Sequence, residues 1–318
     1  MVHVVYNIVR DGVNDATPPN GPVDAGAPRG GPQHTTPDGV TLRRCATRDD
    51  FLQCVALQAE TWGDGFTDKV PVTILELAQR LGGVTAGAFD PAGRLLGFVF
   101  GMAGRLGRRP VHWSDILAVR PDGRDRGLGT RLKHYQRELL RDTEAEAIYW
   151  TFDPLIARNA HLNLTRLGAR AVQYVRDMYG PDTGSALHSG LGTDRLVAEW
   201  PLRADAGRDG AARDATSAGS VSAVGGASWD AAPVVNPPDA AGRPAFAPAD
   251  APAVRVAIPA DIHGVLREAP GAAGAWREST RDAFEWYLAR GYAVAGFAAE
   301  RGRGGAYHLT RPAGGEDR

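Results

Sequence analysis

Residues 116–132 read as a strand, a turn rich in glycine and arginine, and then an amphipathic helix. Such a turn leaves the first backbone N–H groups of the helix unpaired and pointing outward. The helix dipole behind them favours an anion, and a pyrophosphate suits such a site. Gly127 and Gly129 place no Cβ between the phosphates and the backbone, and Arg124 and Arg126 add positive charge. The segment therefore predicts a phosphate-binding turn.

Three classes of phosphate-bearing ligand bind to turns of this general kind. A Walker loop ends in Gly-Lys-Ser/Thr, whereas Gly129-Thr130 lacks the lysine. A dinucleotide fingerprint needs three glycines that open the first βαβ unit. Only two glycines are in register here, and they follow strands of antiparallel type. Acyl-coenzyme A is the alternative that fits.

The pattern around the turn predicts one mixed α/β (α+β) domain over residues 40–203, with strand and helix periodicities in turn. Strands are expected at residues 40–44, 84–89, 95–102, 111–119, 147–152, 171–178 and 196–202. Helices are expected at residues 49–60, 72–81, 128–141 and 157–167.

Glycine and proline mark the segments outside this domain. The 318 residues include 40 glycines and 22 prolines, which exceeds average usage. Residues 1–39 and 204–252 hold too little apolar surface to offset the entropy of ordering, so we expect a disordered N-terminal tail and a flexible linker or insertion. Residues 253–318 predict a small α/β extension. We expect it to pack on the first domain, because about 65 residues barely support a separate core.

Composition excludes several classes of protein. A formal net charge of -1 gives no general attraction to nucleic acid or an anionic membrane. Cys45 and Cys54 are too few for a disulfide scaffold or a four-cysteine zinc site, and no metal-ligand spacing is present. No apolar run approaches the roughly 18 residues of a membrane helix, and the N-terminus lacks a signal-peptide pattern. We expect a soluble cytoplasmic protein without a metal, and the oligomeric state stays open.

The spacing Arg124-x-x-Gly127-x-Gly129 after a strand resembles the signature turn of the GNAT acyltransferases. The order of elements in residues 40–203 is similar to that fold, so the resemblance covers about half of the chain. Within the superfamily, the chain resembles a bacterial group of GNAT-like proteins with a C-terminal extension. The similar stretches are residues 150–155, 158–163, 189–196, 258–261 and 276–281. The resemblance implies an acyl-CoA-binding fold and an acyltransferase.

The resemblance also implies a binding mode for the co-substrate, acetyl-CoA or another acyl-CoA. The strand before the turn would splay from its neighbour, and its exposed backbone at Leu117 and Val119 would pair with the pantetheine amides. The N–H groups from Arg126 to Thr130 would hold the pyrophosphate. The implied cofactor-binding residues are Leu117, Val119, Arg124, Arg126, Gly127, Leu128, Gly129, Thr130 and Asn159.

The second cofactor motif of the superfamily is an Asn, a Tyr seven residues on and a Gly four residues later. Anchored on Gly168, the motif places Ala157 at the Asn position and Leu164 at the Tyr position. The tyrosine that protonates the leaving thiolate in the family is therefore not carried over, and water would suffice as the proton source. Asn159 is near but out of register, so its contact with pantetheine is a hypothesis.

Transfer to an amine also needs a base, because a lysine-type amine has a pKa of about 10.4. The candidates are His112 and Asp115, on the strand before the turn. His112 would titrate near neutrality, and its alternative is a partly exposed strand histidine. Asp115 has a structural alternative in a turn or an arginine contact. Strand alternation places His112 and Ser114 on one face, and Asp115 and Leu117 on the other.

Other residues have a binding interpretation and a structural one. Asp153 follows a strand directly, with a turn or helix cap as its structural interpretation, and Arg195 could bind an acceptor carboxylate or form a surface ion pair. Trp62 could wall the acceptor pocket or pack in the core. Residues 188–193 could form a lid or a long hairpin loop.

The sequence thus favours an acyl-CoA-dependent N-acyltransferase, most simply an N-acetyltransferase. An amine of an unknown acceptor would attack the thioester directly in a ternary complex. The missing tyrosine keeps a non-catalytic acyl-CoA-binding module as one alternative. An O-acyltransferase that acts on a small molecule is another.

Overall fold

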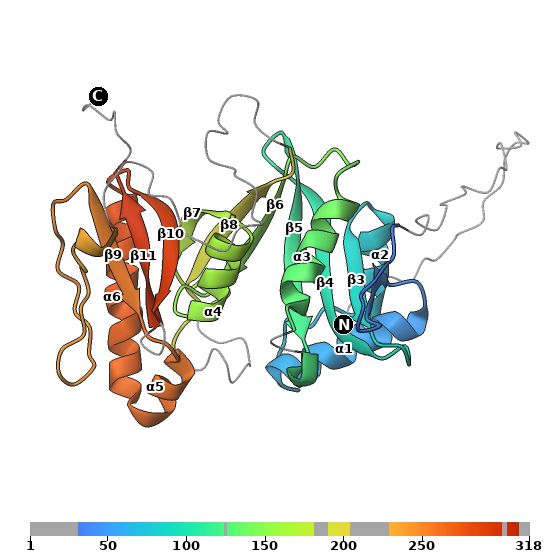
Figure 1. The fold of residues 1–318 in the computed structure, drawn as a ribbon, viewed down its shortest axis with the longest axis horizontal. Helices are drawn as coiled ribbons and strands as arrows, with labels where there is room; N and C mark the ends of the chain where they lie inside the picture. Colours follow the sequence, from blue (N-terminus) through green and yellow to red (C-terminus); the bar gives the residue numbers. More distant parts are fainter. Residues whose placement is uncertain (1–30, 124–125, 181–189, 204–228, 301–303, 312–318) are drawn as a thin grey trace, which may run out of the picture.

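The computed structural model describes residues 31–123, 126–180, 190–203, 229–300 and 304–311 (Figure 1). They form a mixed α/β fold with two sheets, which confirms the predicted fold class. The larger sheet has eight strands in the order β1-β2-β3-β4-β5-β6-β8-β7, and the smaller has the order β10-β11-β9. All strand pairs are antiparallel except β5 with β6.

The strands of the larger sheet are β1 (His34–Thr35), β2 (Thr41–Arg44), β3 (Val84–Phe89), β4 (Leu95–Leu106), β5 (Arg109–Val119), β6 (Ala147–Phe152), β7 (Arg170–Val175) and β8 (Arg195–Pro201). Its helices are α1 (Arg48–Trp62), α2 (Val72–Arg80), α3 (Leu128–Leu139) and the short α4 (Ala157–Ala160), which continues as a π-helical turn (His161–Arg166). The smaller unit comprises β9 (Ala253–Ile258), α5 (Ile262–Glu268), α6 (Pro270–Leu288), β10 (Ala293–Glu300) and β11 (Gly304–Thr310).

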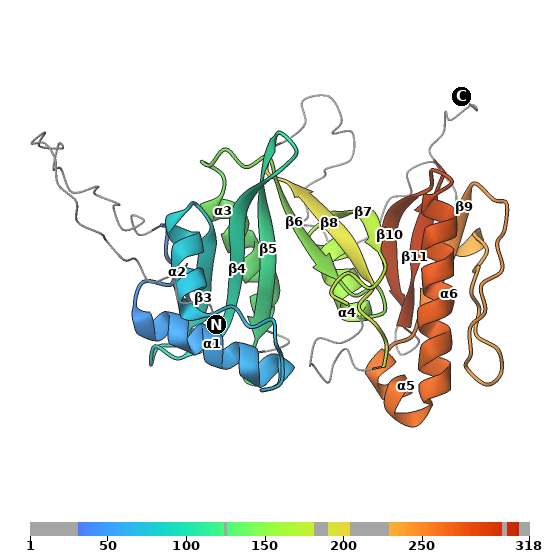
Figure 2. The same ribbon diagram turned by 180° about the vertical axis from the view of Figure 1, so that it is seen from behind.

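Helices cover both faces of strands β3 to β5 (Figures 1 and 2). Alternate side chains of each strand point to opposite faces, so each face has its own core. On one face, Phe98 and Phe100 of β4 join the apolar residues of α1 and α2. On the other face, Val99 packs with Leu128 and Leu132 of α3.

Local signals explain where two of these elements begin. The side chain of Thr47 accepts a hydrogen bond from the backbone of Asp50, and Asp50 reciprocates, so a capping box starts α1. Between β3 and β4, the carboxylate of Asp90 accepts hydrogen bonds from the N–H groups of Ala92 and Arg94, and Gly93 adopts a φ of 81°. This turn pairs the two strands as the sequence predicts.

The C-terminal unit packs on the β6–β8–β7 end of the larger sheet and shares its core. The Tyr174 ring stacks on Phe284 of α6 at 5.3 Å between centroids. The hydroxyl of Tyr307 donates to the carbonyl of Pro154 at 2.7 Å. One side of the C-terminal unit is therefore packed against the larger sheet.

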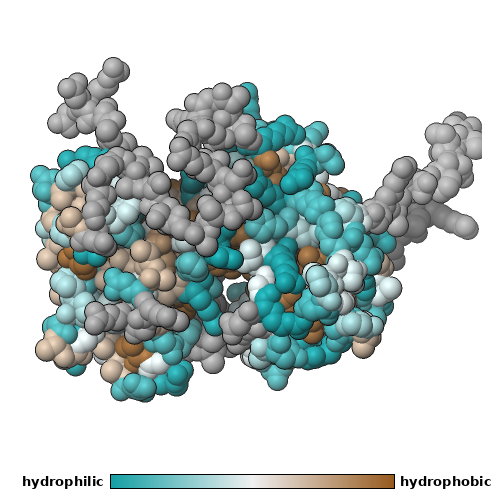
Figure 3. Space-filling view, viewed as in Figure 1, coloured by the Kyte–Doolittle hydropathy of each residue, from teal (hydrophilic) through white to brown (hydrophobic). Residues whose placement is uncertain are grey.

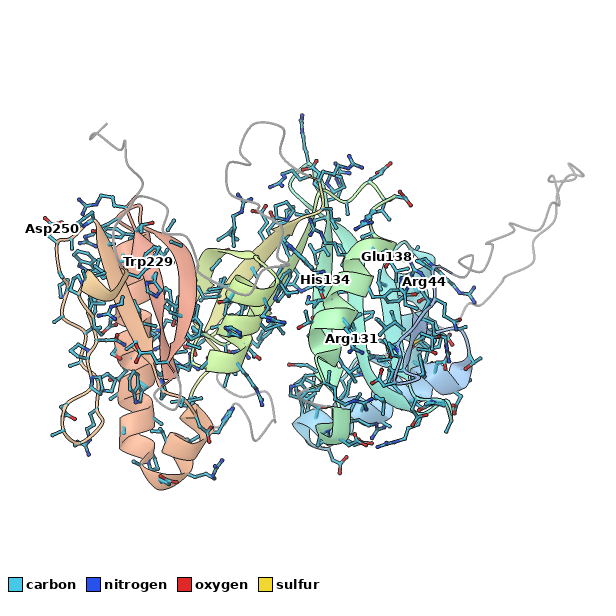
Figure 4. The ribbon with its side chains drawn as sticks, viewed as in Figure 1. Arg44, Arg131, His134, Glu138, Trp229 and Asp250 are labelled. Carbon is cyan, nitrogen blue, oxygen red and sulfur yellow. The ribbon has the colours of Figure 1, made fainter. Side chains whose placement is uncertain are left out.

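Two segments expected to be disordered are partly structured. Residues 31–39 include β1, and the Pro32 carbonyl accepts a 2.5 Å hydrogen bond from Tyr135 of α3. Residues 229–252 lie along β9, where the Asn236 side chain bonds the backbone N–H and carbonyl of Ala257. Figure 4 labels Trp229 and Asp250 near the two ends of this segment. Composition missed both segments because they are ordered by contacts with other elements: β2 and α3 for the first segment and β9 for the second.

No helix among the described residues is long and apolar enough to cross a membrane.

Candidate active site

Strands β5 and β6 pair over only two positions, His112 with Ile148 and Trp113 with Tyr149. Opposite Phe100 and Gly101 of β4, Asp115 is an extra residue in β5, which makes a β-bulge. A bulge bends its strand, and β5 beyond it separates from β6 (Figures 1 and 2). Beyond this point, the edges of β5 and β6 that face each other no longer form hydrogen bonds with each other. An extended ligand with amide groups could pair with such an edge.

A cavity of about 350 Å³ lies between the separated strands. Its walls come from β5, β6 and α3, from the end of α1 and from the chain around α4, and the C-terminal unit adds His263. Figure 3 shows this face of the molecule hollowed near its centre. The volume lies within the range of small-molecule sites.

The expected phosphate turn leads into α3 as the sequence predicts. Gly127 is the N-cap residue with a φ of 70°, a left-handed conformation that favours glycine, and no side chain caps the helix. The N–H groups of the first helical turn are therefore open to a ligand. A Cβ built on Gly129 would touch only the Leu117 side chain, at 3.7 Å. Since Leu117 lines the cavity, the turn adjoins the cavity wall.

The other predicted cofactor residues are distributed around these two features. Asn159 lines the cavity, whereas Val119 is not among the lining residues and packs half-buried against the core. Arg126 is exposed and forms an ion pair with Asp38. Leu128 is buried and Thr130 is half-buried, so only their backbone N–H groups suit a phosphate. Arg124 and the predicted loop residue His188 lie outside the described residues.

Asp38 lies next to the turn and contacts two arginines. It pairs with Arg126 and lies 3.8 Å from Arg131 of α3, which Figure 4 labels with Glu138 on the same helix. Hydrogen bonds from Thr36 and Arg126 lower the pKa of Asp38 to about 2. The arginines beside the turn are therefore already paired with a carboxylate of this chain.

His112 does not line the cavity, and the expectation that it titrates near neutrality is wrong. Its side chain is completely buried under α3, where its Nε2 lies 3.1 Å from Nε2 of Gln136. Burial lowers the pKa of His112 to about 3, so the imidazole is neutral at physiological pH. His112 is therefore not the partly exposed histidine of the alternative interpretation. It is also not positioned to take a proton from a ligand in the cavity.

Asp115 does line the cavity, at the bulge of β5. The side chain is exposed to the cavity, yet enough protein surrounds it that burial raises its pKa, and Asp68 raises it further. No ion pair between described residues includes it, so the arginine contact considered above is absent from this part of the chain. The bulge also breaks the strand alternation that the sequence pattern assumed.

Three cavity residues carry chemistry that the sequence pattern did not single out. Lys133 of α3 is 2% exposed, and its Nζ lies 2.8 Å from Oγ of Ser114. Tyr179 lies 2.8 Å from the Thr151 hydroxyl, hydroxyl to hydroxyl, and burial raises its pKa. One signal was available for Lys133, because lysine is rare in this chain. Tyr179 follows β7, and no local pattern places it beside β6.

An ion-pair network joins the cavity to the C-terminal unit. Asp153 lines the cavity and accepts a 2.7 Å hydrogen bond from Arg277 of α6, while Arg195 lies 3.8 Å away. Behind them, Arg281 binds both carboxylate oxygens of Asp194 at 2.8 Å. Burial opposes ionisation of Asp194, but the hydrogen bonds from Arg281 and Tyr174 lower its pKa to about 2. The α6 helix therefore holds one side of the cavity in place.

For three residues, the structure bears on the alternative interpretations given above. Asp153 both starts a turn, by accepting from the N–H of Leu155 at 2.8 Å, and lines the cavity. Arg195 is buried and lines the cavity, so it is not the surface ion pair of its structural alternative. Trp62 lines the cavity at the end of α1 and stacks on Phe66.

No group of three or more His, Cys, Asp or Glu residues could hold a metal within the described ranges.

No protein-family model and no curated protein matches the chain. Solved structures are similar to it in fold over about half of its length. The NatC complex bound to Gag peptide and CoA contains one, with 15% identity over 52% of this chain and 99% of that chain, at a TM-score of 0.41. A second is yncA from Salmonella typhimurium with its cofactor acetyl-CoA, with 18% identity over 54% and 99% of the two chains, at a TM-score of 0.43. A third is the ribosomal-protein-S18-alanine N-acetyltransferase from Escherichia coli, with 16% identity over 51% and 94%, at a TM-score of 0.40.

Proposed function

We propose that the chain is an acyl-CoA-dependent N-acyltransferase of the GNAT type, most simply an N-acetyltransferase. The observation that carries the proposal is the separation of β5 from β6 around the cavity, next to the uncapped start of α3. One end of this arrangement offers strand-edge amides and the other offers helical N–H groups. Acyl-CoA has matching chemistry, since its pantetheine carries amides and its other half carries a pyrophosphate.

The co-substrate would lie along β5 with its phosphates at the turn. The backbone at Leu117 and Val119 would pair with the pantetheine, and Asn159 would contact it from the α4 side. The N–H groups from Arg126 to Thr130 would bind the pyrophosphate, with added charge from the arginines at 124 and 126. The acyl group would then lie in the cavity.

The cavity also supplies candidates for proton transfer. An acceptor ammonium must lose a proton before it attacks, and Asp115 is the carboxylate of β5 that reaches the cavity. Its raised pKa makes it a stronger base than an ordinary carboxylate once ionised. Tyr179 stays protonated at neutral pH because its pKa is raised, so it could protonate the thiolate that leaves. It would serve in place of the tyrosine that the family has at the position of Leu164.

Co-substrate binding is tested first by thermal unfolding with acetyl-CoA, CoA and no ligand. A ligand at about 100 times its Kd adds about 2.7 kcal/mol to the free energy of unfolding. We expect a clear rise in Tm with both CoA forms. No shift at millimolar acetyl-CoA would contradict the proposal.

The Gly129→Glu variant tests where the phosphates bind. The added Cβ has room, and a carboxylate in the first turn suits the helix dipole, so the fold should keep its stability. The same carboxylate would repel a pyrophosphate, and we expect Kd for CoA to rise about tenfold or more. Gly129→Gln is the matched neutral control and should bind distinctly better. Equal affinities of the two variants would place the phosphates elsewhere.

Acetyl transfer is then measured as CoA release with a panel of amines. Turnover would establish the transferase, whereas binding without turnover on any amine would favour a non-catalytic acyl-CoA-binding module.

A further inference from the structure

Lysine is nearly absent from this chain, which makes Lys133 unusual. Of 36 lysines and arginines only Lys69 and Lys133 are lysines. Lys69 bonds the Asp64 carbonyl near the surface, whereas Lys133 is buried against the cavity. An arginine keeps its proton in a protein, but a buried lysine can lose it. One of the two lysines of the chain, Lys133, therefore lies at the candidate active site, where it can lose its proton.

The surroundings of Lys133 favour a neutral amine. Its Nζ lies 2.8 Å from Oγ of Ser114, 3.5 Å from Oε1 of Gln136 and 3.9 Å from the centre of the Trp150 ring. All three neighbours are uncharged. Burial lowers the pKa of Lys133 well below its usual value, which favours the neutral amine with a lone pair on Nζ. The hydrogen bond to Ser114 can then run from the hydroxyl to the amine.

Ser114 occupies a position where a nucleophile could meet a bound thioester. It follows the last residue of β5 that pairs with β6 and precedes the bulge at Asp115. Its side chain and Lys133 both line the cavity. A hydroxyl within hydrogen-bond distance of a neutral base, with the base held by a third group, is the arrangement of an activated nucleophile. Gln136 is the third group here.

We propose that Ser114 and Lys133 form a serine–lysine dyad that carries the acyl group as a serine ester during transfer. This proposal rests on the proposed function, because acyl-CoA supplies the acyl group.

The first half-reaction forms the ester. Oγ of Ser114 attacks the thioester carbonyl, and its proton passes to Nζ of Lys133. The carbon–sulfur bond then breaks, and the coenzyme A thiolate takes that proton from Lys133, in place of the Tyr179 proton of a direct transfer, and leaves as the thiol. Open N–H groups on the edge of β5 are available to the negative carbonyl oxygen.

The second half-reaction returns the enzyme to its starting state. A neutral amine attacks the serine ester, and the carbon–oxygen bond to Oγ breaks. The amine gives up one proton through Lys133, and Oγ takes a proton from the same residue. The products are the amide and free Ser114, so atoms and electrons balance without a further reactant.

The ester can be trapped because the dyad acts before any acceptor binds. The full chain is mixed with acetyl-CoA without an amine, quenched in acid and weighed by mass spectrometry. We expect a gain of one acetyl group, which maps to the peptide of Ser114 and is removed by neutral hydroxylamine. A hydroxylamine-resistant acetyl group on Lys133 would overturn the dyad, because the amine itself would then be the nucleophile.

Variants with matched controls test each member of the dyad. Ser114→Ala should abolish the adduct, whereas Ser279→Ala removes a buried serine of α6 and should leave it unchanged. Lys133→Met keeps most of the side-chain length without the amine and should slow acylation by about 10²–10⁴-fold. Lys69→Met should have no effect.

A measurement on the unmodified protein remains decisive if a variant fails to fold. The dyad predicts exchange of label between acetyl-CoA and free CoA without an acceptor, and direct transfer in a ternary complex does not. Thermal shifts with acetyl-CoA are recorded in parallel. No shift would refute the proposed function itself. A shift with amine-dependent turnover but without exchange or adduct would refute the dyad alone.

Discussion

Strands β3–β5 bury polar side chains on both of their faces. The side chains under α1 and α2 have different hydrogen-bond partners from those under α3. Under α1 and α2 three of these side chains bond backbone groups: Gln58 to Val70, Gln79 to the Cys45 carbonyl and Thr85 to the Leu75 carbonyl. Under α3, by contrast, the polar side chains bond one another. They are His112, Ser114, Lys133 and Gln136.

The difference indicates what each group of polar side chains is for. A buried backbone N–H or carbonyl needs a partner, so the first set is explained by folding. The second set satisfies only its own members, and apolar residues of similar shape could replace it at little cost. Two of its members, Ser114 and Lys133, lie on the cavity wall, which gives the set a use that folding does not.

The largest effect is expected under α1 and α2, for Gln58→Leu. The variant leaves the N–H and carbonyl of Val70 without their partner. We expect the free energy of unfolding to fall by about 2–3 kcal/mol, measured by denaturant titration. Gln173→Leu on the exposed side of β7 is the control and should change it by less than about 0.5 kcal/mol. If Gln58→Leu leaves the free energy of unfolding unchanged, the proposed difference between the two faces is wrong.

The next effect is the acid sensitivity of the α3 face. His112 has a folded pKa of about 3, below the unfolded value of about 6.5. As the pH falls below 6.5, the unfolded chain binds a proton that the folded chain does not, so stability is lost until the pH reaches the folded pKa.

This loss amounts to about 1.4 kcal/mol per pH unit from His112, or about 2 kcal/mol between pH 7 and pH 5. Lys133 acts in the same direction, so comparison with a variant isolates His112. His112→Gln should flatten the dependence by that amount in denaturant titrations at several pH values. Gln173→Leu, which removes no titratable group, should leave it as it is. Parallel curves for wild type and His112→Gln would show that folding does not lower the pKa of His112.

The smallest effect on stability is expected for Lys133→Met. The side chain bonds no backbone group, and an apolar side chain relieves the burial of an amine. We expect a free energy of unfolding within about 1 kcal/mol of the wild type, or above it. A loss of several kcal/mol would show that the polar set under α3 also serves folding.

Much of the fold could be predicted from the sequence because its signals are local. The strand–turn–helix at Gly127 and the β3–β4 turn at Asp90 arise from residues a few positions apart. The candidate site was less accessible. Asp115, Leu117 and Asn159 do lie on the cavity, but the bulge, the burial of His112 and the approach of Tyr179 follow no local pattern.

The sequence by itself determined most of the helices and strands and the turn before α3, since periodicity, caps and glycine act within a few residues. Only the tertiary structure decided which side chains meet. Ser114 and Lys133 are 19 residues apart, and Asp153 and Arg277 are 124 apart. Burial sets the pKa values of His112 and Lys133, and burial exists only once distant segments have packed together. The chemistry of the cavity is therefore a property of that packing.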